Sequence, residues 1–480
     1  MQPMDRRTFL QRAASVGLAV ATPSWRRALA ADIQPAEVRG HVVSGKEPLP
    51  GVRVSDGFRV TRTDRSGEFR LPVGPDSGPF VFVTVPRGFW VDRFYHPTAM
   101  GATKQPVFAL NRHKADDAYR ALYLTDIHLG DGRSDQSFKR FQATIDEINK
   151  MDPLPAFCWM GGDISLQRGE GQRYVEMISG LKMPVRNGVG NHEMLIQQPD
   201  PRAEFEGLFG PTYYSFDVGN VHYITLDGCQ VDPREKQQVL GELSARELHW
   251  LEEDLINVPD GMATVVAIHI PLASDYPERR DTTAERAPHW IIQNSGDVID
   301  LLSRHSVSLV LQGHLHENQR IVRKGIEFVE SISVAGTWWK ARAKQRELGV
   351  SGEPRGYRVL DVQGERISHR YRGSAESQSD AIGEIVGRPQ RVSAGVELAL
   401  EANVFDASEQ AKVLARIDDA PPTVLDRSDD KKHFQNLKPA HHWKLMVSAN
   451  RMTTGRHRLQ IQLNEPGQVS ESFEHTIFAS

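Results

Sequence analysis

Residues 307–319 read VSLVLQGHLHENQ, an apolar run that ends in a glycine and two histidines one residue apart. The run has the length and composition of a buried strand, and Gly313 permits a tight turn directly after it. A His-x-His pair alone is weak evidence for a metal site, because most such histidines are solvated or hydrogen-bonded to other groups. Its meaning depends on whether other apolar runs in the chain also end in residues that bind metals.

Four further apolar runs end in such residues. They are ALYLT before Asp126-Ile127-His128, AFCWM before Gly161-Gly162-Asp163, VRNGV before Gly190-Asn191-His192-Glu193, and ATVVAI before His269. The carboxyl ends of parallel strands lie at one edge of a sheet, so we expect these side chains to meet. If the segments after the strands are extended, residues i and i+2 point the same way, and each of the pairs Asp126/His128 and His314/His316 can face one place.

The donor set consists of two carboxylates, one amide oxygen and four imidazoles. These are Asp126, His128, Asp163, Asn191, His269, His314 and His316. Hard oxygens mixed with imidazoles suit Mn, Fe, Zn or Ni, and the lack of thiolate argues against a structural zinc site. Seven donors are too many for one tetrahedral ion and fit two divalent ions that share a carboxylate. Two such ions, two aspartates and a bridging hydroxide leave a charge of about +1, which suits a phosphate.

The ordered set DIH, GGD, GNHE, IHIP and GHLH resembles the calcineurin-like metallophosphoesterases over residues 117–320. The resemblance implies an α/β fold, a four-layer core with mixed β-sheets, and a two-metal phosphoesterase. By motif, Asp126, His128, Asp163 and His316 would hold one ion, and Asp163, Asn191, His269 and His314 the other. It also makes His192 the candidate catalytic acid that protonates the leaving oxygen, unless it only hydrogen-bonds the phosphate.

One position departs from the family pattern. Many members carry GDxxD, whose second Asp orients the histidine, whereas GGDISL places Leu166 there, so the orienting partner of His192 is not identified from the sequence. Leu166 and His128 also argue against the purple acid phosphatase branch. The stretches FGPTYYSFDVGNVHYITLDG, SISVAGTWW and EPRGYRVLDVQG are similar to a bacterial subgroup with an N-terminal β-sandwich and a C-terminal β domain.

Changes in the pattern of apolar and turn-forming residues along the chain predict its domains. Residues 33–113 are short β runs separated by turn dipeptides such as Asp56-Gly57, which predict a β-sandwich similar to the carboxypeptidase-regulatory-like domains. Residues 114–373 alternate strands and helices, which predicts the α/β phosphoesterase domain. Residues 374–386 read as a linker, and 387–480 as a second all-β, sandwich-like domain.

Several local signals within the α/β domain can be checked in a structure. The apolar spacing in SDQSFKRFQATIDEINKM predicts an amphipathic helix. Ser244 and Glu247 form a capping-box pattern before a second helix, and Ser295 is a candidate cap for a third. Gly219-Asn220 lies between two β runs and predicts a hairpin turn.

The first 30 residues read as a targeting signal. Arg6-Arg7 precede Thr8-Phe9-Leu10 and a short apolar run, a pattern similar to the twin-arginine export signal. We therefore expect an exported or periplasmic protein whose partner is the twin-arginine export machinery. No later stretch is long and apolar enough for a transmembrane helix. The formal net charge of −4 predicts no nucleic-acid binding surface.

The two cysteines and two of the histidines outside the donor set are expected to pack in the protein interior. Cys158 and Cys229 fall in strand-like segments, so we expect buried, unpaired thiols. His222 and His249 are expected to be satisfied core residues.

Two further segments are candidates for the substrate rim. The polar stretch SDYPERRDTTAERAP after His269 carries Arg279, Arg280 and Arg286, which could contact a phosphate or leaving group, although a solvated loop is the default for such a run. Trp338 and Trp339 could wall a substrate pocket or pack between domains.

Together these features predict an exported metal-dependent hydrolase of phosphate esters that acts by attack of a hydroxide bridging two ions about 3.5–4 Å apart. A diester is preferred, because the second Asp of the motif is missing and no fixed Lys or Arg clamp for a dianion is evident. The substrate would be a small-molecule or a lipid- or glycan-linked phosphate ester. The alternatives are a phosphomonoesterase of the same fold, a non-catalytic envelope binding protein with a degenerate site, and a metal-dependent hydrolase of a non-phosphate ester.

Overall fold

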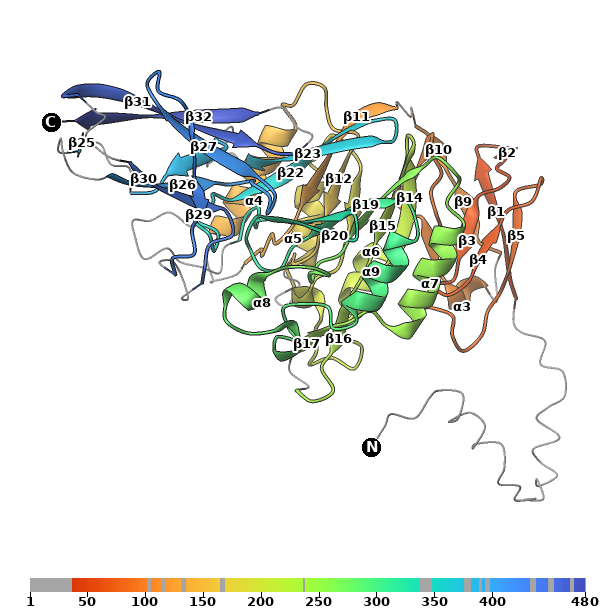
Figure 1. Ribbon diagram of the computed structural model, residues 1–480. Helices are drawn as coiled ribbons and strands as arrows, with labels where there is room; N and C mark the ends of the chain where they lie inside the picture. The colour runs from red at the N-terminus through yellow and green to blue at the C-terminus, as the bar shows by residue number, and fades with distance from the viewer. Residues whose placement is uncertain are drawn as a thin grey trace.

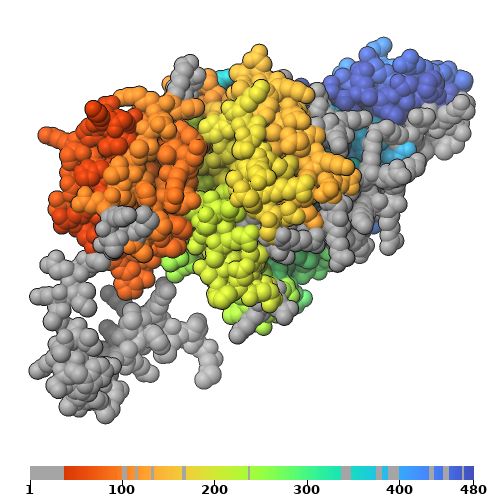
Figure 2. Space-filling model, turned by 180° about the vertical axis from the view of Figure 1, so that it is seen from behind, coloured from red at the N-terminus to blue at the C-terminus, as the bar shows by residue number. Residues whose placement is uncertain are grey.

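The computed structural model describes residues 37–101, 105–113, 117–130, 135–164, 169–235, 238–336, 348–374, 381–387, 391–392, 398–431, 437–447, 453–466 and 470–479. The N-terminal and C-terminal β-rich parts lie at opposite ends of a central α/β core (Figure 1). The same order is visible from behind in the space-filling view (Figure 2). The core therefore contacts one β domain on each side.

Two mixed β-sheets form the core. The first has the strand order β13 (Val185–Asn187), β12 (Phe157–Met160), β11 (Ala118–Leu124), β22 (Gly356–Gln363) and β23 (Arg366–Gly373). The second has the order β14 (Tyr214–Val218), β15 (Val221–Thr225), β18 (Ala263–Ala267), β19 (Val307–Gln312), β21 (Ile326–Glu330) and β20 (Gln319–Arg323). Strands β11, β12 and β13 are parallel, as are β15, β18, β19 and β21. This arrangement gathers several carboxyl strand ends at one edge of each sheet.

The alternation of side chains along β11 separates the layers. Ala121 and Tyr123 pack into the cluster between the two sheets, whereas Leu122 and Leu124 pack into the cluster on the outer face. That outer face is covered by α4 (Gln136–Ile148) and α5 (Gly171–Ile178), and the outer face of the second sheet by α7 (Ala245–Ile256) and α9 (Ser295–Ser303) (Figure 1). The core thus has four layers, helix, sheet, sheet and helix, as the family resemblance implies.

The predicted helix, hairpin turn and Ser244 cap are confirmed by the structure, and the predicted Ser295 cap is not. The amphipathic helix is α4, and the hairpin turn at Gly219-Asn220 joins β14 to β15. Ser244 caps α7 through its hydroxyl, which accepts the N–H of Glu247 at 3.2 Å. The Glu247 carboxylate accepts the N–H of Asp227 at 2.7 Å. The expectation that Ser295 caps α9 is wrong, because the N-cap is Asn294 and Ser295 is already the first helical residue.

The remaining elements of the core are short and lie in the connections between its strands. They are η3 (Asn191–Glu193), α6 (Ala203–Phe209), β16 (Cys229–Val231), β17 (Val239–Gly241), α8 (Tyr276–Arg279) and η4 (Ala284–Arg286). Cys158 and Cys229 are buried and unpaired, as expected. Within the described residues, no helix has both the length and the apolar character needed to cross a bilayer.

The N-terminal part packs tightly against the core. One sheet holds β2 (Glu47–Pro48), β1 (Glu37–Ser44), β5 (Glu68–Pro72) and β9 (Val107–Ala109), and another β4 (Val60–Arg62), β3 (Arg53–Ser55), β6 (Phe80–Val83) and β8 (Tyr95–Pro97). The strands β7 (Phe89–Trp90) and β10 (Asn111–Arg112) pair with each other, and α3 (Thr98–Gly101) follows β8. Arg53 forms a buried ion pair with Asp217 of β14 at 2.7 Å, so a charge contact joins this part to the core.

The C-terminal part has a hydrophobic core of its own, built around residues such as Trp443 and Leu459. One sheet has the order β24 (Gly383–Ile385), β26 (Leu398–Val404), β30 (His442–Val447) and β29 (Asp426–Arg427). The other has the order β25 (Arg391–Val392), β32 (Glu471–Ala479), β31 (Gly455–Asn464), β27 (Lys412–Ile417) and β28 (Thr423–Val424). Strand β24 falls inside the stretch 374–386 that we expected to be a linker. Its pairing with β26 makes it part of the domain.

Candidate metal centre

The predicted donors lie where the carboxyl ends of the parallel strands of one sheet face those of the other sheet. Six of them, together with His192, form three groups in which one ligand atom from each residue lies within 4.8 Å of the ligand atoms of the others. The groups are Asp126 with His128 and His316, Asp163 with His269 and His314, and His128 with Asp163 and His192. Because Asp163 and His128 each belong to two groups, the groups form one continuous cluster.

The shortest distances place Asp163 between the first two groups. Its Oδ2 lies 3.1 Å from His269 Nε2 and 3.5 Å from His128 Nε2. On the other side, His316 Nε2 lies 3.0 Å both from Asp126 Oδ1 and from His128 Nε2. Two imidazole nitrogens this close need a proton or a cation between them, since their lone pairs would otherwise repel each other.

The backbone at the donors is left-handed rather than extended. Asp126, His128, Asp163, His314 and His316 have φ between 48° and 77°, and they are five of the eight described non-glycine residues with positive φ. Such residues are uncommon and cluster at functional sites, where the surrounding contacts offset the strain. The expectation of extended segments is therefore wrong. Each pair of side chains is instead presented by a tight left-handed turn.

Glycines allow the turns to approach one another. Gly162 has φ of 99°, and a Cβ there would lie 2.7 Å from the backbone nitrogen of Gly190. A Cβ at Gly313 would lie 2.3 Å from Thr125 Oγ1. Side chains at these positions would push apart the turns that carry the predicted donors.

Hydrogen bonds fix the two aspartates. Asp126 Oδ2 accepts from Thr125 Oγ1 at 2.8 Å and from the His314 N–H at 3.0 Å. Asp163 Oδ1 accepts from the His192 N–H at 2.9 Å. In each carboxylate one oxygen is held by the protein, and the other oxygen faces the imidazoles.

Two histidines have ring tautomers set by carbonyl groups. His269 Nδ1 donates to the carbonyl of Gly161 at 2.9 Å, which leaves Nε2 to face Asp163. His314 Nε2 donates to the carbonyl of His289 at 2.8 Å, which leaves Nδ1 as its free nitrogen. This outer bond is typical of histidines that bind metals through the opposite nitrogen.

The charges of the site favour a cation. Burial alone would raise the pKa of Asp126, but His316 and His269 hold it well below its usual range. Burial would also raise the pKa of Asp163, but the neighbouring His269 and His192 lower it. Although burial opposes its protonation, Asp163 and Asp126 raise the pKa of His269 to about 9. Two buried, ionised carboxylates thus draw positive charge into the cluster.

Unsatisfied polar atoms test whether the residues fit metal ions. Among the described residues, Asn191 Oδ1 is buried and has no hydrogen-bond partner, while the buried Asp126 Oδ1 and His269 Nε2 face only other donors of the cluster. Burial, with His269 nearby, lowers the pKa of His314 to about 4, so this imidazole is neutral at neutral pH. Buried acceptors and neutral imidazoles without partners are costly unless they bind a cation. The residues therefore fit divalent ions with mixed oxygen and nitrogen ligands.

Models of known protein families match nearly all of the chain that the structure describes. The family model "Calcineurin-like phosphoesterase" matches residues 119–318. The models for the N-terminal and C-terminal parts of such proteins match residues 36–113 and 330–464. The chain belongs to the calcineurin-like phosphoesterases. It is therefore a hydrolase of phosphoric esters, and its family uses divalent metal ions.

Two curated relatives show how broad this phosphoesterase family is. The chain is 24% identical over 261 residues to serine/threonine-protein phosphatase CPPED1 of Bos taurus, covering 51% of this chain and 76% of the relative. It is 26% identical over 248 residues to a 3',5'-cyclic-nucleotide phosphodiesterase of Nostoc, covering 50% and 86%. Among solved structures, a putative 5'-nucleotidase of Staphylococcus aureus shares 15% identity with a TM-score of 0.35 and covers 53% of each chain.

A cleft of about 790 Å³ opens beside the phosphoesterase site. Asn191 and His314 contribute to its wall. The wall also contains Met194, Leu195, Ile196, Gln197, Gln198, Glu204, Gln238, Val239, His289 and Trp290, together with Gly169. The cleft is large enough for an ester with an extended leaving group.

His192 occupies the boundary between cluster and solvent. Its side chain is 17% exposed, and its Nε2 lies 3.9 Å from Asp163 Oδ2. Its ring packs edge-on against His128 at a centroid distance of 4.6 Å. It is thus placed to reach a bound ester. Leu166, which replaces the orienting Asp of the family motif, lies outside the described residues.

The predicted rim residues need one correction. Arg279 does not lie on a rim, because it is buried and its guanidinium contacts Asp275, Glu317 and the carbonyl of Lys438. Arg280 packs over the rings of Tyr276 and Trp290, and Arg286 is exposed on η4. Neither belongs to the described cleft wall. Trp338 and Trp339 lie outside the described residues.

Sequence reasoning missed three residues of the site. Glu193 Oε2 accepts the N–H groups of Asp163 and Gly190, and Oε1 accepts that of Ile164, each at 2.8 Å. His289 orients His314 through its carbonyl, and Trp290 lines the cleft. Glu193 belongs to the GNHE motif and could have been found there. No sequence signal identifies the other two.

Proposed function

We propose that this chain is an exported phosphoesterase that uses two divalent ions and hydrolyses phosphodiesters in preference to monoesters. The observation that carries the proposal is the position of Asp163, whose Oδ2 faces His128 of one donor group and His269 of the other. A carboxylate between two donor groups can be shared by two neighbouring ions, which suits a two-metal site.

The proposed ligands follow the family motif, and the donor groups bring together three members of each set. Asp126, His128, Asp163 and His316 would hold one ion, and Asp163, Asn191, His269 and His314 the other. Bound divalent ions would act as Lewis acids on the phosphoryl oxygens and lower the pKa of water in the site. The identity of the ions, Mn, Fe or Zn, is to be tested.

The protein's own residues would orient the ester and move the proton. The fixed carboxylates of Asp126 and Asp163 keep the site geometry before substrate arrives, so little reorganisation is needed during reaction. His192, partly exposed beside Asp163, would donate a proton from its imidazole to the leaving oxygen. The cleft beside Asn191 and His314 would hold the leaving group.

The preference for a diester follows from charge. A diester carries one negative charge at neutral pH and a monoester up to two, so a monoester needs more compensating charge. The cleft wall, as far as it is described, offers amides from Gln197, Gln198 and Gln238, the aromatic Trp290 and the carboxylate Glu204. The Nostoc relative is named as a cyclic-nucleotide phosphodiesterase, which is in line with a diester.

A phosphomonoesterase is the second candidate, because the CPPED1 relative is named as a protein phosphatase. The test compares bis(p-nitrophenyl) phosphate with p-nitrophenyl phosphate on protein loaded with Mn²⁺, Zn²⁺ or Fe²⁺. We expect faster turnover of the diester, loss of activity on chelation and recovery on adding metal. Much faster monoester turnover would reverse the preference. Asp163→Asn is the control, and activity unchanged in this variant would contradict the two-metal site.

Export is proposed from the Arg6-Arg7 pattern alone. Twin-arginine export moves folded protein, so the metals would be loaded before export. A reporter fused after residue 30 should appear outside the cytoplasm, and replacing both arginines with lysine should retain it inside. Export of the double-lysine variant at the parent's level would contradict the proposal.

A further inference from the structure

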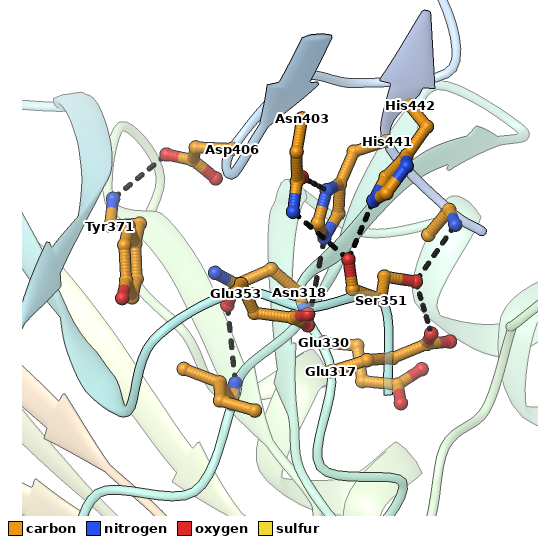
Figure 3. Close-up of polar contacts among 12 residues, drawn as sticks. Glu317, Asn318, Glu330, Ser351, Glu353, Tyr371, Asn403, Asp406, His441 and His442 are labelled. Atoms are coloured by element: carbon orange, nitrogen blue, oxygen red, sulfur yellow. Dashed lines mark hydrogen bonds and ion pairs between the residues drawn. The ribbon is translucent and has the colours of Figure 1, made fainter. Parts of the chain in front are cut away.

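A buried polar cluster joins the turn that carries His314 and His316 to the C-terminal domain (Figure 3). From the core come Glu317 and Asn318, directly after His316, and the loop residues Ser351 and Glu353 between β21 and β22. From the C-terminal domain come Asn403, His441 and His442. All seven residues are at most 1% exposed. Burying so many polar groups costs free energy unless they are hydrogen-bonded.

Ser351 receives three hydrogen bonds from the C-terminal domain. Its carbonyl oxygen accepts from Asn403 Nδ2 at 3.0 Å and from His442 Nε2 at 2.7 Å. Its Oγ accepts the N–H of Ala440 at 2.9 Å and donates to Glu317 Oε2 at 3.4 Å. One serine therefore connects the C-terminal domain to the residue next to His316.

Glu353 forms a second connection. Its Oε1 accepts the N–H of Asn318 at 2.7 Å and lies 3.6 Å from His441 Nε2. The other ring nitrogen of His441 donates to Asn403 Oδ1 at 2.6 Å. The backbone two residues after His316 is thus held by the Glu353 carboxylate, which lies next to a histidine of the C-terminal domain.

Three further contacts complete the frame around the turn. The Val350 N–H donates to the carbonyl of His316 at 3.3 Å. Arg279 contacts the Glu317 carboxylate and also donates to the carbonyl of Lys438, which lies in the C-terminal part, at 2.9 Å. The turn is held from both sides by groups that themselves bind the C-terminal domain.

We infer that Ser351 and Glu353 are positioning residues for the metal ligand His316, and that through them the C-terminal domain supports the metal centre. This inference rests on the proposed function, in which His316 binds an ion. His316 has φ of 54°, and such a conformation persists only when surrounding contacts determine it. The frame of Ser351 and Glu353 supplies those contacts.

Metal affinity of the full-length protein tests the inference without depending on turnover. Mn²⁺ is titrated into metal-free parent, Glu353→Ala and Glu353→Gln by calorimetry, and bound Mn²⁺ is followed by electron paramagnetic resonance. Loss of a group that hydrogen-bonds a metal ligand typically weakens metal affinity by about 10–100-fold, and we expect the lower end of this range for Glu353→Ala, because Glu353 contacts the backbone two residues after His316. Glu353→Gln keeps an oxygen for the Asn318 N–H and should recover most of the affinity.

The matched control is Glu247→Ala. Glu247 is also a buried carboxylate that accepts a backbone N–H, that of Asp227, at 2.7 Å, but it lies on α7, on the side of the N-terminal domain. It should lose stability with Mn²⁺ affinity unchanged. If Glu353→Ala fails to fold, Ser351→Ala, which removes only the hydroxyl, decides the question and should weaken Mn²⁺ binding several-fold.

The outcomes separate the inference from the proposed function. Parent-like Mn²⁺ affinity in folded Glu353→Ala and Ser351→Ala overturns the positioning role and leaves the proposed function intact. An equal loss of affinity in Glu247→Ala also overturns it, because the effect would then be general destabilisation. A parent protein that binds no Mn²⁺, Zn²⁺ or Fe²⁺ refutes the proposed function itself.

Discussion

The Glu193 carboxylate holds the backbone of Asp163, because its Oε2 accepts the Asp163 N–H at 2.8 Å. The same oxygen accepts the Gly190 N–H, and Oε1 accepts the Ile164 N–H, both at 2.8 Å. Glu193 thereby ties the turn after β12 to the turn after β13. Both turns carry proposed metal ligands, so this fully buried carboxylate sets the spacing between them.

Replacing Glu193 with glutamine should loosen this spacing. An amide offers one acceptor oxygen in place of two and turns its NH₂ group toward backbone donors. We expect metal affinity and kcat to fall by about 10–100-fold. Metal content and kcat are measured together, with Glu176→Gln, an exposed glutamate on α5, as the control. Parent-like metal content in the Glu193 variant would show that the tie does not position the ligands.

The turns also depend on Gly162. Gly162 has φ of 99°, and a Cβ at this position would lie 2.7 Å from the Gly190 nitrogen. An alanine there would therefore strain its own backbone and displace the neighbouring turn. Backbone strain of this kind costs about 1–3 kcal/mol, and the clash adds to it. Gly162→Ala should lower the free energy of unfolding by at least this amount in a urea titration. Gly325→Ala, with φ of 80° and open space around its Cβ, gives the cost of strain alone. An equal loss in both variants would exclude the clash.

The convergence of the donors could be predicted because it depends on residue types at strand ends. Asp126, Asp163 and His269 each follow a buried strand, and the parallel order brings those ends together. The left-handed conformation of the turns could not be predicted, because Asp and His adopt it more often than most residues do but at few of their positions, and tertiary contacts decide where. Their role as metal ligands stays a proposal that metal analysis will decide.

Arg279 illustrates what the sequence conceals. In a polar stretch next to a candidate ligand, an arginine is expected to be solvated or to face the substrate. Its actual partners include the carbonyl of Lys438, which is 159 residues away along the chain. The same applies to Glu353 and His441, whose proximity follows from the docking of a separate domain. Contacts between domains leave no local pattern that a single sequence can reveal.

The buried group around His222 should make stability depend on pH. His222 Nδ1 lies 2.6 Å from Asp217 Oδ1 and its Nε2 lies 2.8 Å from Asp254 Oδ2, while Arg53 pairs with Asp217. Burial and the charge of Arg53 both lower the pKa of His222. Asp254 and Asp217 raise it, and their effect prevails, so the pKa lies above 6.5. A raised pKa stabilises the fold fully below 6.5, and this contribution is lost as pH rises through the folded-state value.

His222→Gln isolates this contribution. The parent should exceed the variant in free energy of unfolding at about pH 6, and the difference should shrink toward about pH 9. Breaking a buried pair of this kind costs about 3–5 kcal/mol, which sets the expected difference at the lower pH. Urea titrations at both pH values measure it. A difference that grows with pH would mean that His222 is neutral in the folded protein.

His192 should affect the leaving group rather than the metal. A general acid contributes about 10²–10⁴-fold when the leaving oxygen needs a proton, and much less when the leaving group is stable as an anion. His192→Asn should therefore lower kcat strongly for an alkyl phosphodiester and weakly for bis(p-nitrophenyl) phosphate. Metal content is measured in parallel, because His192 belongs to a donor group with His128 and Asp163. Equal losses on both substrates with full metal content would assign His192 to binding the phosphate, and loss of metal would make it a ligand.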